Sequence, residues 1–260
     1  MEKYLVDLFA TAAQEQGQAP LWIVRLYLSL FNVPLGKTLR VDLVKHLLHG
    51  QNLQGKRVLD VGCGVGDLSF ILADRGADVI GLELDPQKVD CANRVAKRWH
   101  FEGLRFLAAD VTKLDEMGLG QFDAIFCVAL LEHIQDDVAL LRQMQQMLRP
   151  GGLFVLEVPS ALRKTIPEVE AADGHVRPGY IFDEVPELLA STGLRAVNRR
   201  SVDPLGLIYR WFASSRIIPG KKARRWLFAA LAPIFIPLIR LTSALIKRPG
   251  AELCFLAVKD

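Results

Sequence analysis

The stretch VLDVGCGVGDLSF, residues 58–70, joins a β-rich run to a helical one through three alternate glycines. Gly62, Gly64 and Gly66 stand where the chain must turn from strand into helix. Glycines at alternate positions let a backbone bend sharply and approach a ligand more closely than side chains would permit. We therefore expect a strand, a tight turn and a helix around a nucleotide-like ligand.

The glycine spacing and one carboxylate narrow the class of that ligand. Gly66 follows Gly64 by two residues, not by the three of the dinucleotide fingerprint GxGxxG. Asp60, just before the glycines, would repel a pyrophosphate, but it suits a ligand that carries an amino group and no phosphate. For the glycines alone, a generic tight turn is the alternative.

On either side of this turn, β-rich and helical runs alternate. Strands are expected over 57–62, 77–83, 104–110, 122–128 and 152–158, with helices after Gly66, after Pro86 and over 134–148. A helix near 184–191, a strand over 194–202 and a final strand over 252–258 follow. Strand and helix alternation with nearly continuous apolar strands predicts an α/β fold, in which helices cover both faces of a parallel sheet.

The composition argues against several other classes of protein. Of the 260 residues, 51% are apolar and 23% are charged, so the chain can bury a core and is not a disordered tail. The four cysteines are far apart and form no CxxC pair, which indicates neither a zinc site nor a disulfide framework. The N-terminal segment lacks the basic and apolar regions of a secretory signal, so we expect a cytoplasmic protein.

A basic, apolar segment lies near the C-terminal end. The net charge is only +3, but residues 195–248 contain twelve Lys and Arg against a single acid, Asp203. In residues 221–248 these cations flank apolar runs, a pattern typical of a helical hairpin or broken helix in the interface of an anionic membrane. A buried lid or a dimer contact is the alternative. We expect an N-terminal helical cap over 1–52, a core over 53–202 plus 251–260, and an insertion over 203–250.

The motif D-x-G-C-G-x-G resembles motif I of the class I S-adenosylmethionine-dependent methyltransferases, and further blocks support the resemblance in order. Glu83 matches the acid that accepts hydrogen bonds from the ribose hydroxyls, and Asp110 the acid near the adenine amino group. The resemblance implies a Rossmann-like fold, with a mostly parallel seven-stranded sheet, and S-adenosyl-L-methionine as cofactor. The residues it assigns to the cofactor are Arg40, Asp60, Gly62, Cys63, Gly64, Gly66, Glu83, Leu84, Asp110, Val111 and Cys127.

Within that class, the chain is most similar to the ubiquinone-pathway O-methyltransferase type. In those enzymes an arginine before motif I reaches the cofactor carboxylate, and Arg40 is the matching residue here. The same relatives carry a Glu and then a Glu-His pair after the fourth strand, a grouping suited to a divalent metal. This chain has Ala129 in place of the first Glu, which leaves Glu132 and His133, so we expect no metal.

The candidate catalytic residues are Glu132, His133 and His175, which fall on segments expected to face the methyl-transfer chamber. A hydroxyl acceptor would need a base, although the sequence does not fix whether oxygen, nitrogen or carbon is methylated. The alternatives are a helix cap for Glu132, a backbone-bonded residue for His133 and a solvated loop residue for His175.

The expected acceptor is a small amphipathic molecule, such as a quinone precursor, an isoprenoid, a lipid or a lipid-linked sugar. Two apolar segments, 21–35 and 226–246, support it, and the cationic insertion would hold the enzyme on the inner face of a membrane. Nucleic acid is not expected, because residues 127–130 lack the N/D-P-P-Y/F element of base methylases. A methyltransferase of a soluble metabolite and a non-catalytic cofactor-binding membrane module remain alternatives, and the oligomeric state is left open.

Overall fold

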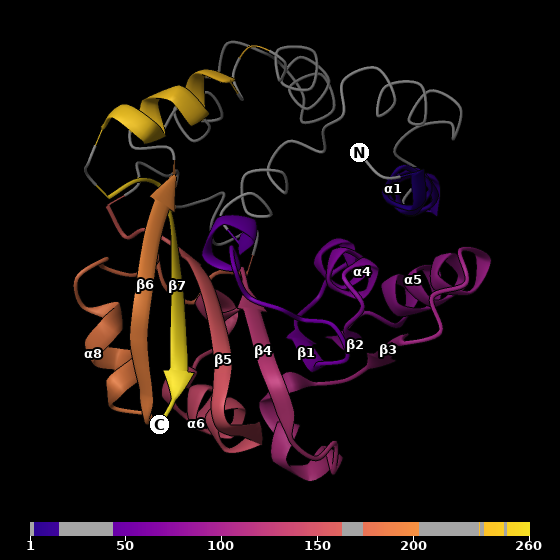
Figure 1. Cartoon of the computed structure of the whole chain (residues 1–260), viewed down its shortest axis with the longest axis horizontal. Helices are drawn as coiled ribbons and strands as arrows, with labels where there is room; N and C mark the ends of the chain where they lie inside the picture. Colours follow the sequence, from indigo (N-terminus) through magenta and orange to yellow (C-terminus); the bar gives the residue numbers. More distant parts are fainter. Residues whose placement is uncertain (1–2, 16–43, 163–173, 203–233, 235–236, 247–248) are drawn as a thin grey trace.

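A single seven-stranded sheet forms the centre of the protein (Figure 1). The computed structural model describes residues 3–15, 44–162, 174–202, 234, 237–246 and 249–260. The strand order is β3-β2-β1-β4-β5-β7-β6, and β7 runs in the direction opposite to the other six strands. The strands are β1 (Arg57–Val61), β2 (Asp78–Glu83), β3 (Leu104–Ala108), β4 (Phe122–Val128), β5 (Leu148–Pro159), β6 (Leu194–Val202) and β7 (Glu252–Lys259). The predicted α/β fold with a mostly parallel sheet is confirmed.

Two apolar clusters, one on each face of the sheet, hold the fold together. Helices α1 (Lys3–Glu15), α4 (Asp67–Asp74) and α5 (Pro86–Arg98) contribute to one cluster. The other cluster contains residues of η1 (Val111–Met117), η2 (Leu131–His133), α6 (Asp137–Met147) and α8 (Val185–Ala190). Successive strand residues point to opposite faces, so strands buried on both faces become almost continuously apolar. The runs in β1, β4 and β5 follow from this requirement.

Two elements begin three or more residues away from the start expected from the sequence. Helix α6 begins at Asp137 rather than at residue 134, because the Asp136 carboxylate accepts a hydrogen bond from the Ala139 amide at 2.9 Å and caps the helix there. Strand β5 begins at Leu148, four residues before the expected start, since Leu148 already pairs with Phe122.

The C-terminal ends of the parallel strands lie at one edge of the sheet. Neighbouring strands that run in the same direction must end at the same edge. Val202, the last residue of β6, pairs with Glu252, the first residue of β7, so the intervening segment leaves and returns at the same edge. A helical run over residues 237–245 lies beyond the end of β6 (yellow in Figure 1).

Several expectations concern residues outside the described part of the chain. The apolar segment 21–35, Arg40 and most of the insertion 203–250 fall there. The boundaries of the cap, core and insertion therefore remain predictions. No helix among the described residues combines the length and apolar character needed to cross a membrane.

Candidate active site

The glycine turn between β1 and α4 has a backbone that favours glycine at each of the three positions. The φ angles of Gly62, Gly64 and Gly66 are 73°, 62° and 88°, in the left-handed region. A Cβ on Gly62 would come within 2.8 Å of Leu130, and one on Gly66 within 2.5 Å of Phe106. At Gly64 no atom lies within 4 Å of that position, so a ligand has room to approach the backbone there.

Asp60 lies beneath this turn and is 2% exposed. Its Oδ2 atom accepts a hydrogen bond of 2.5 Å from the hydroxyl of Ser69 in α4. Burial of a carboxylate is costly unless hydrogen bonds compensate it, and Ser69 supplies one of them. The contact joins the end of β1 to the helix after the glycines, and the role of Asp60 toward the cofactor remains a prediction.

Glu83, at the end of β2, is fixed against the same turn. Its Oε2 atom accepts a hydrogen bond from the Gly64 amide at 3.0 Å, and its Oε1 atom accepts from the Asp85 amide at 3.1 Å. The Lys88 ammonium also lies 3.2 Å from Oε1. The side chain of Glu83 is only 13% exposed, so the carboxylate is held in one orientation before any ligand binds. Leu84, the next residue, is 71% exposed and leaves an apolar surface beside it.

Asp110 lies beyond the end of the neighbouring strand β3 and caps η1. Its carboxylate accepts hydrogen bonds from the Thr112 hydroxyl at 2.7 Å and the Thr112 amide at 3.0 Å. These bonds hold the pKa of the Asp110 carboxyl below its ordinary value, so the group is ionised near neutral pH. The Ala109 amide donates to the Glu83 carbonyl at 2.9 Å, which keeps the ends of the two strands together.

The other residues assigned to the cofactor, Cys63, Val111 and Cys127, are buried. Cys63 and Val111 are 9% and 7% exposed, so little of either residue is accessible. Cys127 is fully buried on β4, and burial raises the pKa of its thiol, so the thiol itself is not presented to a ligand. A contact from Cys127 would have to come from its backbone.

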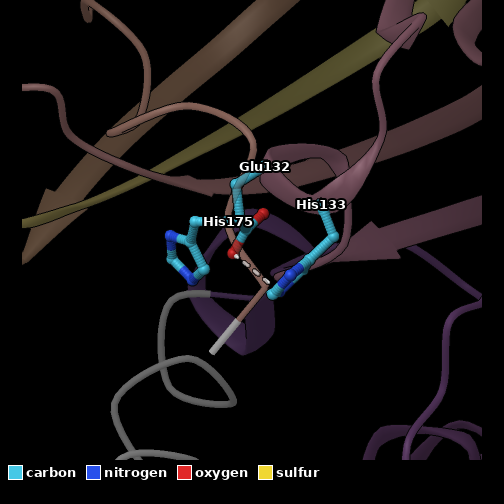
Figure 2. Close-up of side chains that lie close together, drawn as sticks. All are labelled: Glu132, His133 and His175. Atoms are coloured by element: carbon cyan, nitrogen blue, oxygen red, sulfur yellow. Dashed lines mark ion pairs between the residues drawn. The ribbon is translucent and has the colours of Figure 1, made fainter. Parts of the chain in front are cut away.

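Glu132, His133 and His175 lie together at the edge where the parallel strands end. Figure 2 shows the carboxylate of Glu132 between the two imidazole rings. Each residue offers one ligand atom, and these atoms all lie within 4.8 Å of one another. The Oε1 atom of Glu132 is 4.0 Å from Nε2 of His133, and the ring centroids of His133 and His175 are 4.7 Å apart. Glu132 is 2% exposed, whereas the His133 side chain is 33% exposed.

The loop that carries His175 is fastened to the segment that carries the other two. The Val176 amide donates to the Glu132 carbonyl at 3.0 Å. Arg177 forms an ion pair with Asp137, at the start of α6, and donates to the Ile134 carbonyl at 2.9 Å. The Tyr180 hydroxyl donates to the same Asp137 carboxylate at 2.8 Å. These contacts form a clamp that places His175 against η2.

The segment that carries Glu132 and His133 adjoins the glycine turn. Leu130, which precedes η2, is the residue whose side chain a Cβ on Gly62 would meet. The His133 amide donates to the Leu130 carbonyl at 2.9 Å. The glycine turn and the segment 130–133 are therefore neighbours at this edge of the sheet.

Comparison with known proteins decides the family. A family model described as a methyltransferase domain matches residues 52–194, more than half of the chain. The chain belongs to this methyltransferase family. It is a class I enzyme that depends on S-adenosylmethionine, as the resemblance implied.

Curated relatives of this methyltransferase include two named ubiquinone biosynthesis O-methyltransferase. The protein from Psychrobacter arcticus is 41% identical over 105 residues, which is 40% of this chain and 41% of the relative. The protein from Acinetobacter baylyi is 34% identical over 104 residues, 40% of this chain and 44% of the relative. The match spans about two fifths of the length of each relative.

Solved structures agree on the fold of the methyltransferase. The N-methyltransferase NodS from Bradyrhizobium japonicum, in complex with S-adenosylhomocysteine, superposes with a TM-score of 0.56 at 17% identity, covering 89% of this chain and 90% of that one. A phosphoethanolamine N-methyltransferase from Haemonchus contortus, in complex with S-adenosylmethionine, gives 0.60 at 18% identity, covering 85% and 52%.

Sequence reasoning missed the residues that hold these side chains in place. Ser69, Lys88, Arg177 and Tyr180 touch Asp60, Glu83 or the start of α6, and the sequence analysis singled out none of them. For Lys88 a signal was present, since it stands five residues after Glu83 in the first turn of an expected helix. No spacing could have paired Tyr180 with Asp137, because the contact depends on the arrangement of β5 and α6.

Proposed function

We propose that this methyltransferase transfers a methyl group from S-adenosylmethionine to a hydroxyl of a small amphipathic acceptor at a membrane surface. The convergence of Glu132, His133 and His175 beside the glycine turn carries the proposal. Glu83 and Asp110 would accept hydrogen bonds from the ribose hydroxyls and the adenine amino group. Asp60 would face the cofactor amino group.

The reaction is an in-line displacement at a methyl carbon. The bond from the acceptor oxygen to the methyl carbon forms while the sulfur–carbon bond of the sulfonium breaks, and S-adenosylhomocysteine leaves with the electron pair. Holding the two reactants at attack distance contributes up to about 7 to 11 kcal/mol in well-oriented systems. The hydroxyl proton must also leave, and we assign its removal to Glu132, His133 and His175.

Two observations support a hydroxyl as the methylated group. The curated relatives are named O-methyltransferases, although the match covers about two fifths of their length. Independently, a cluster of two imidazoles and a carboxylate is suited to removing a proton that only a weakly acidic acceptor would retain at neutral pH. A protonated amine would also need a base, so the names of the relatives carry the choice of a hydroxyl over an amine.

The amphipathic acceptor and the membrane surface rest on the helical run over residues 237–245. Ile239 is fully buried and anchors this run to the core, while an exposed apolar row lies on another side. The row consists of Leu238, Leu241 and Leu245, which are 41%, 56% and 71% exposed. Spacings of three and four residues place them on one helix face. The cations of 221–225 and 247–248 flank this row in the sequence, a combination that suits an anionic lipid surface.

The test is transfer of a labelled methyl group into a lipid extract. The purified enzyme is incubated with methyl-labelled cofactor and either the extract or the matching aqueous metabolites, and the product is analysed by mass spectrometry. We expect label in the organic phase as a methoxy group. Efficient transfer to a soluble acceptor without lipid would favour the lid or dimer role for the insertion, and label on nitrogen or carbon would contradict the hydroxyl assignment.

A further inference from the structure

Gly81 lies inside strand β2, where a glycine often marks the close approach of another group. Its φ angle is outside the left-handed region, so the backbone alone does not require glycine there. A Cβ on Gly81 would instead come within 2.6 Å of the ring of Phe106, the residue paired with it on β3. The same ring would lie 2.5 Å from a Cβ on Gly66, just before α4. The ring of Phe106 therefore occupies the space that both glycines leave open.

This ring lies in the core against the last glycine of the turn. Phe106 is 3% exposed, and its ring centroid is 5.6 Å from that of Phe70 in α4. The Gly66 amide donates to the Cys63 carbonyl at 2.9 Å, and the Phe70 amide donates to the Gly66 carbonyl at 2.9 Å. The ring therefore supports both the hydrogen-bonded end of the turn and the helix that follows it.

The backbone of Phe106 is held by one side chain, Asn93 of α5. The Oδ1 atom of Asn93 accepts a hydrogen bond from the Phe106 amide at 3.0 Å, and its Nδ2 atom donates to the Phe106 carbonyl at 2.9 Å. Because β3 is an edge strand, the side-chain amide takes the place that a further strand would have. The same helix carries Lys88, whose ammonium lies 3.2 Å from Glu83. Helix α5 thus holds both the strand beneath the turn and the acid beside it.

The three glycines that leave room for a ligand also make the turn easy to deform. Glycine has the most backbone freedom to lose, so a ligand that orders a loose turn binds less tightly by the cost of that ordering. A ring packed beneath Gly66 orders the turn before the ligand arrives, which is how preorganisation raises affinity.

We propose that Phe106, held by Asn93, is a positioning residue for the cofactor: its ring keeps the glycine turn in the conformation that binds S-adenosylmethionine. Neither residue needs to touch the cofactor, because the ring acts through Gly66 and the amide of Asn93 acts through the backbone of Phe106. The inference rests on the proposed function only for the assignment of the glycine turn to the cofactor, and it does not depend on which acceptor is methylated.

The first test compares Phe106→Leu with Phe106→Met, which differ in reach more than in volume. The ring atoms nearest the Cβ position of Gly66 are Cε1 and Cζ, which Leu lacks and the longer Met side chain replaces. By calorimetric titration with S-adenosylhomocysteine, we expect Phe106→Leu to raise the Kd at least about tenfold and Phe106→Met to raise it less than about threefold. Equal affinities for the two variants, or wild-type affinity in Phe106→Leu, would overturn the proposal.

Phe101→Leu is the matched control for damage to the core. The Phe101 ring packs in the same aromatic cluster, 5.1 Å from that of Tyr4 and 5.3 Å from that of Phe70. Its replacement should lower the free energy of unfolding in urea, yet leave the Kd within about twofold of the wild type. If Phe101→Leu weakens binding as much as Phe106→Leu does, the loss comes from a general loosening of the core and the positioning role is wrong.

Asn93→Ala tests the second contact without changing the apolar core. It should raise the Kd about threefold to tenfold, since two hydrogen bonds to Phe106 are lost. It should also speed hydrogen exchange at the Gly66 amide, whose bond to Cys63 closes the turn. Asn198→Ala, at an exposed position on β6, should change neither quantity. If Glu83→Ala weakens binding but Asn93→Ala and Phe106→Leu do not, the cofactor site and the proposed function stand and only the positioning role is overturned.

Discussion

Single carboxylates in this site are oriented by the protein itself. Glu83 has hydrogen-bond donors on both oxygens, and Asp110 is held by both donors of Thr112. Groups fixed in this way need little reorganisation when a ligand binds, which is how a site gains affinity without additional contacts. Removing a group that donates a hydrogen bond to one of these carboxylates should therefore matter as much as removing the carboxylate.

Ser69→Ala should destabilise the protein, since it removes a donor from a carboxylate that is almost fully buried. A hydrogen bond to a charged buried group contributes about 1.5 to 3 kcal/mol, so we expect the free energy of unfolding to fall by about that amount. Urea denaturation measures it, with the exposed Ser191→Ala as the control. If Ser69→Ala lowers the free energy of unfolding no more than the control does, the hydrogen bond from Ser69 does not stabilise the buried Asp60 carboxylate.

The Asp123 carboxyl makes the free energy of unfolding depend on pH. Burial alone would raise the pKa of its carboxyl, but the Arg57 amide and the Arg149 guanidinium outweigh burial and hold that pKa below its ordinary value. The contribution to stability is therefore complete above the unfolded-state pKa of about 3.9, and it is lost as pH falls through the folded-state pKa.

We predict that Asp123→Asn lowers the free energy of unfolding by about 1 to 2 kcal/mol near neutral pH. The gap from the wild type should stay constant down to about pH 5 and shrink below about pH 4. Denaturation curves across this range measure it. A gap that persisted undiminished in acid would assign the loss to packing instead of charge.

At the scale of elements, the clamp between the loop of His175 and the start of α6 positions the cluster. Asp137 accepts from both Arg177 and Tyr180 without itself belonging to the cluster. Burial, followed by the contact with Asp137, raises the pKa of Tyr180 well above its ordinary value, so the hydroxyl remains a donor at any physiological pH.

Asp137→Asn should therefore reduce kcat about tenfold, because a loosened His175 misplaces the cluster, while the affinity for S-adenosylhomocysteine stays unchanged. The exposed Asp90→Asn is the control. Steady-state kinetics and calorimetry together separate the two quantities. Equal losses in kcat and in cofactor affinity would indicate general damage to the fold rather than a positioning role.

Some strands and turns could be predicted from the sequence, whereas contacts between distant segments could not. Strands β1, β2 and β4 were predictable because burial on both faces leaves an unbroken apolar run, and Gly62 to Gly66 because only glycine suits their backbone. The place of Glu83 at the end of β2 was predictable from the apolar run that it ends, and its role toward the cofactor stays a prediction from the resemblance. The proximity of His175 to Glu132 was not, since a contact across 43 positions depends on how β5 and its following loop return to η2.

For the whole molecule, the proposed function assigns the cofactor, the acceptor and the membrane surface to one edge of the sheet. The glycine turn, the cluster and the start and end of the insertion all lie where the parallel strands end. Under the proposed function, an acceptor drawn from a membrane would reach the site along the exposed row of Leu238, Leu241 and Leu245.

Vesicle binding should separate an electrostatic part from an apolar part. The cations are Lys221, Lys222, Arg224, Arg225, Lys247 and Arg248. Raising salt from 0.1 M to 1 M shortens the screening length from about 10 Å to about 3 Å, so binding to anionic vesicles should fall with salt and with replacement of these cations by Gln. Leu241→Ser with Leu245→Ser should weaken binding at every salt concentration. Sedimentation that finds equal binding to neutral and anionic vesicles, or none to either, would favour a lid or a dimer contact.

The most direct test of the account is calorimetric titration with S-adenosylhomocysteine of three proteins: the wild type, Glu83→Ala and the exposed-glutamate control Glu102→Ala. We predict one site per chain in the wild type and the control. In Glu83→Ala the affinity should fall at least about tenfold, since two hydrogen bonds to the ribose hydroxyls would be lost. Absence of binding to the wild type, or unchanged binding after Glu83→Ala, would contradict the assignment of this edge of the sheet as the cofactor site.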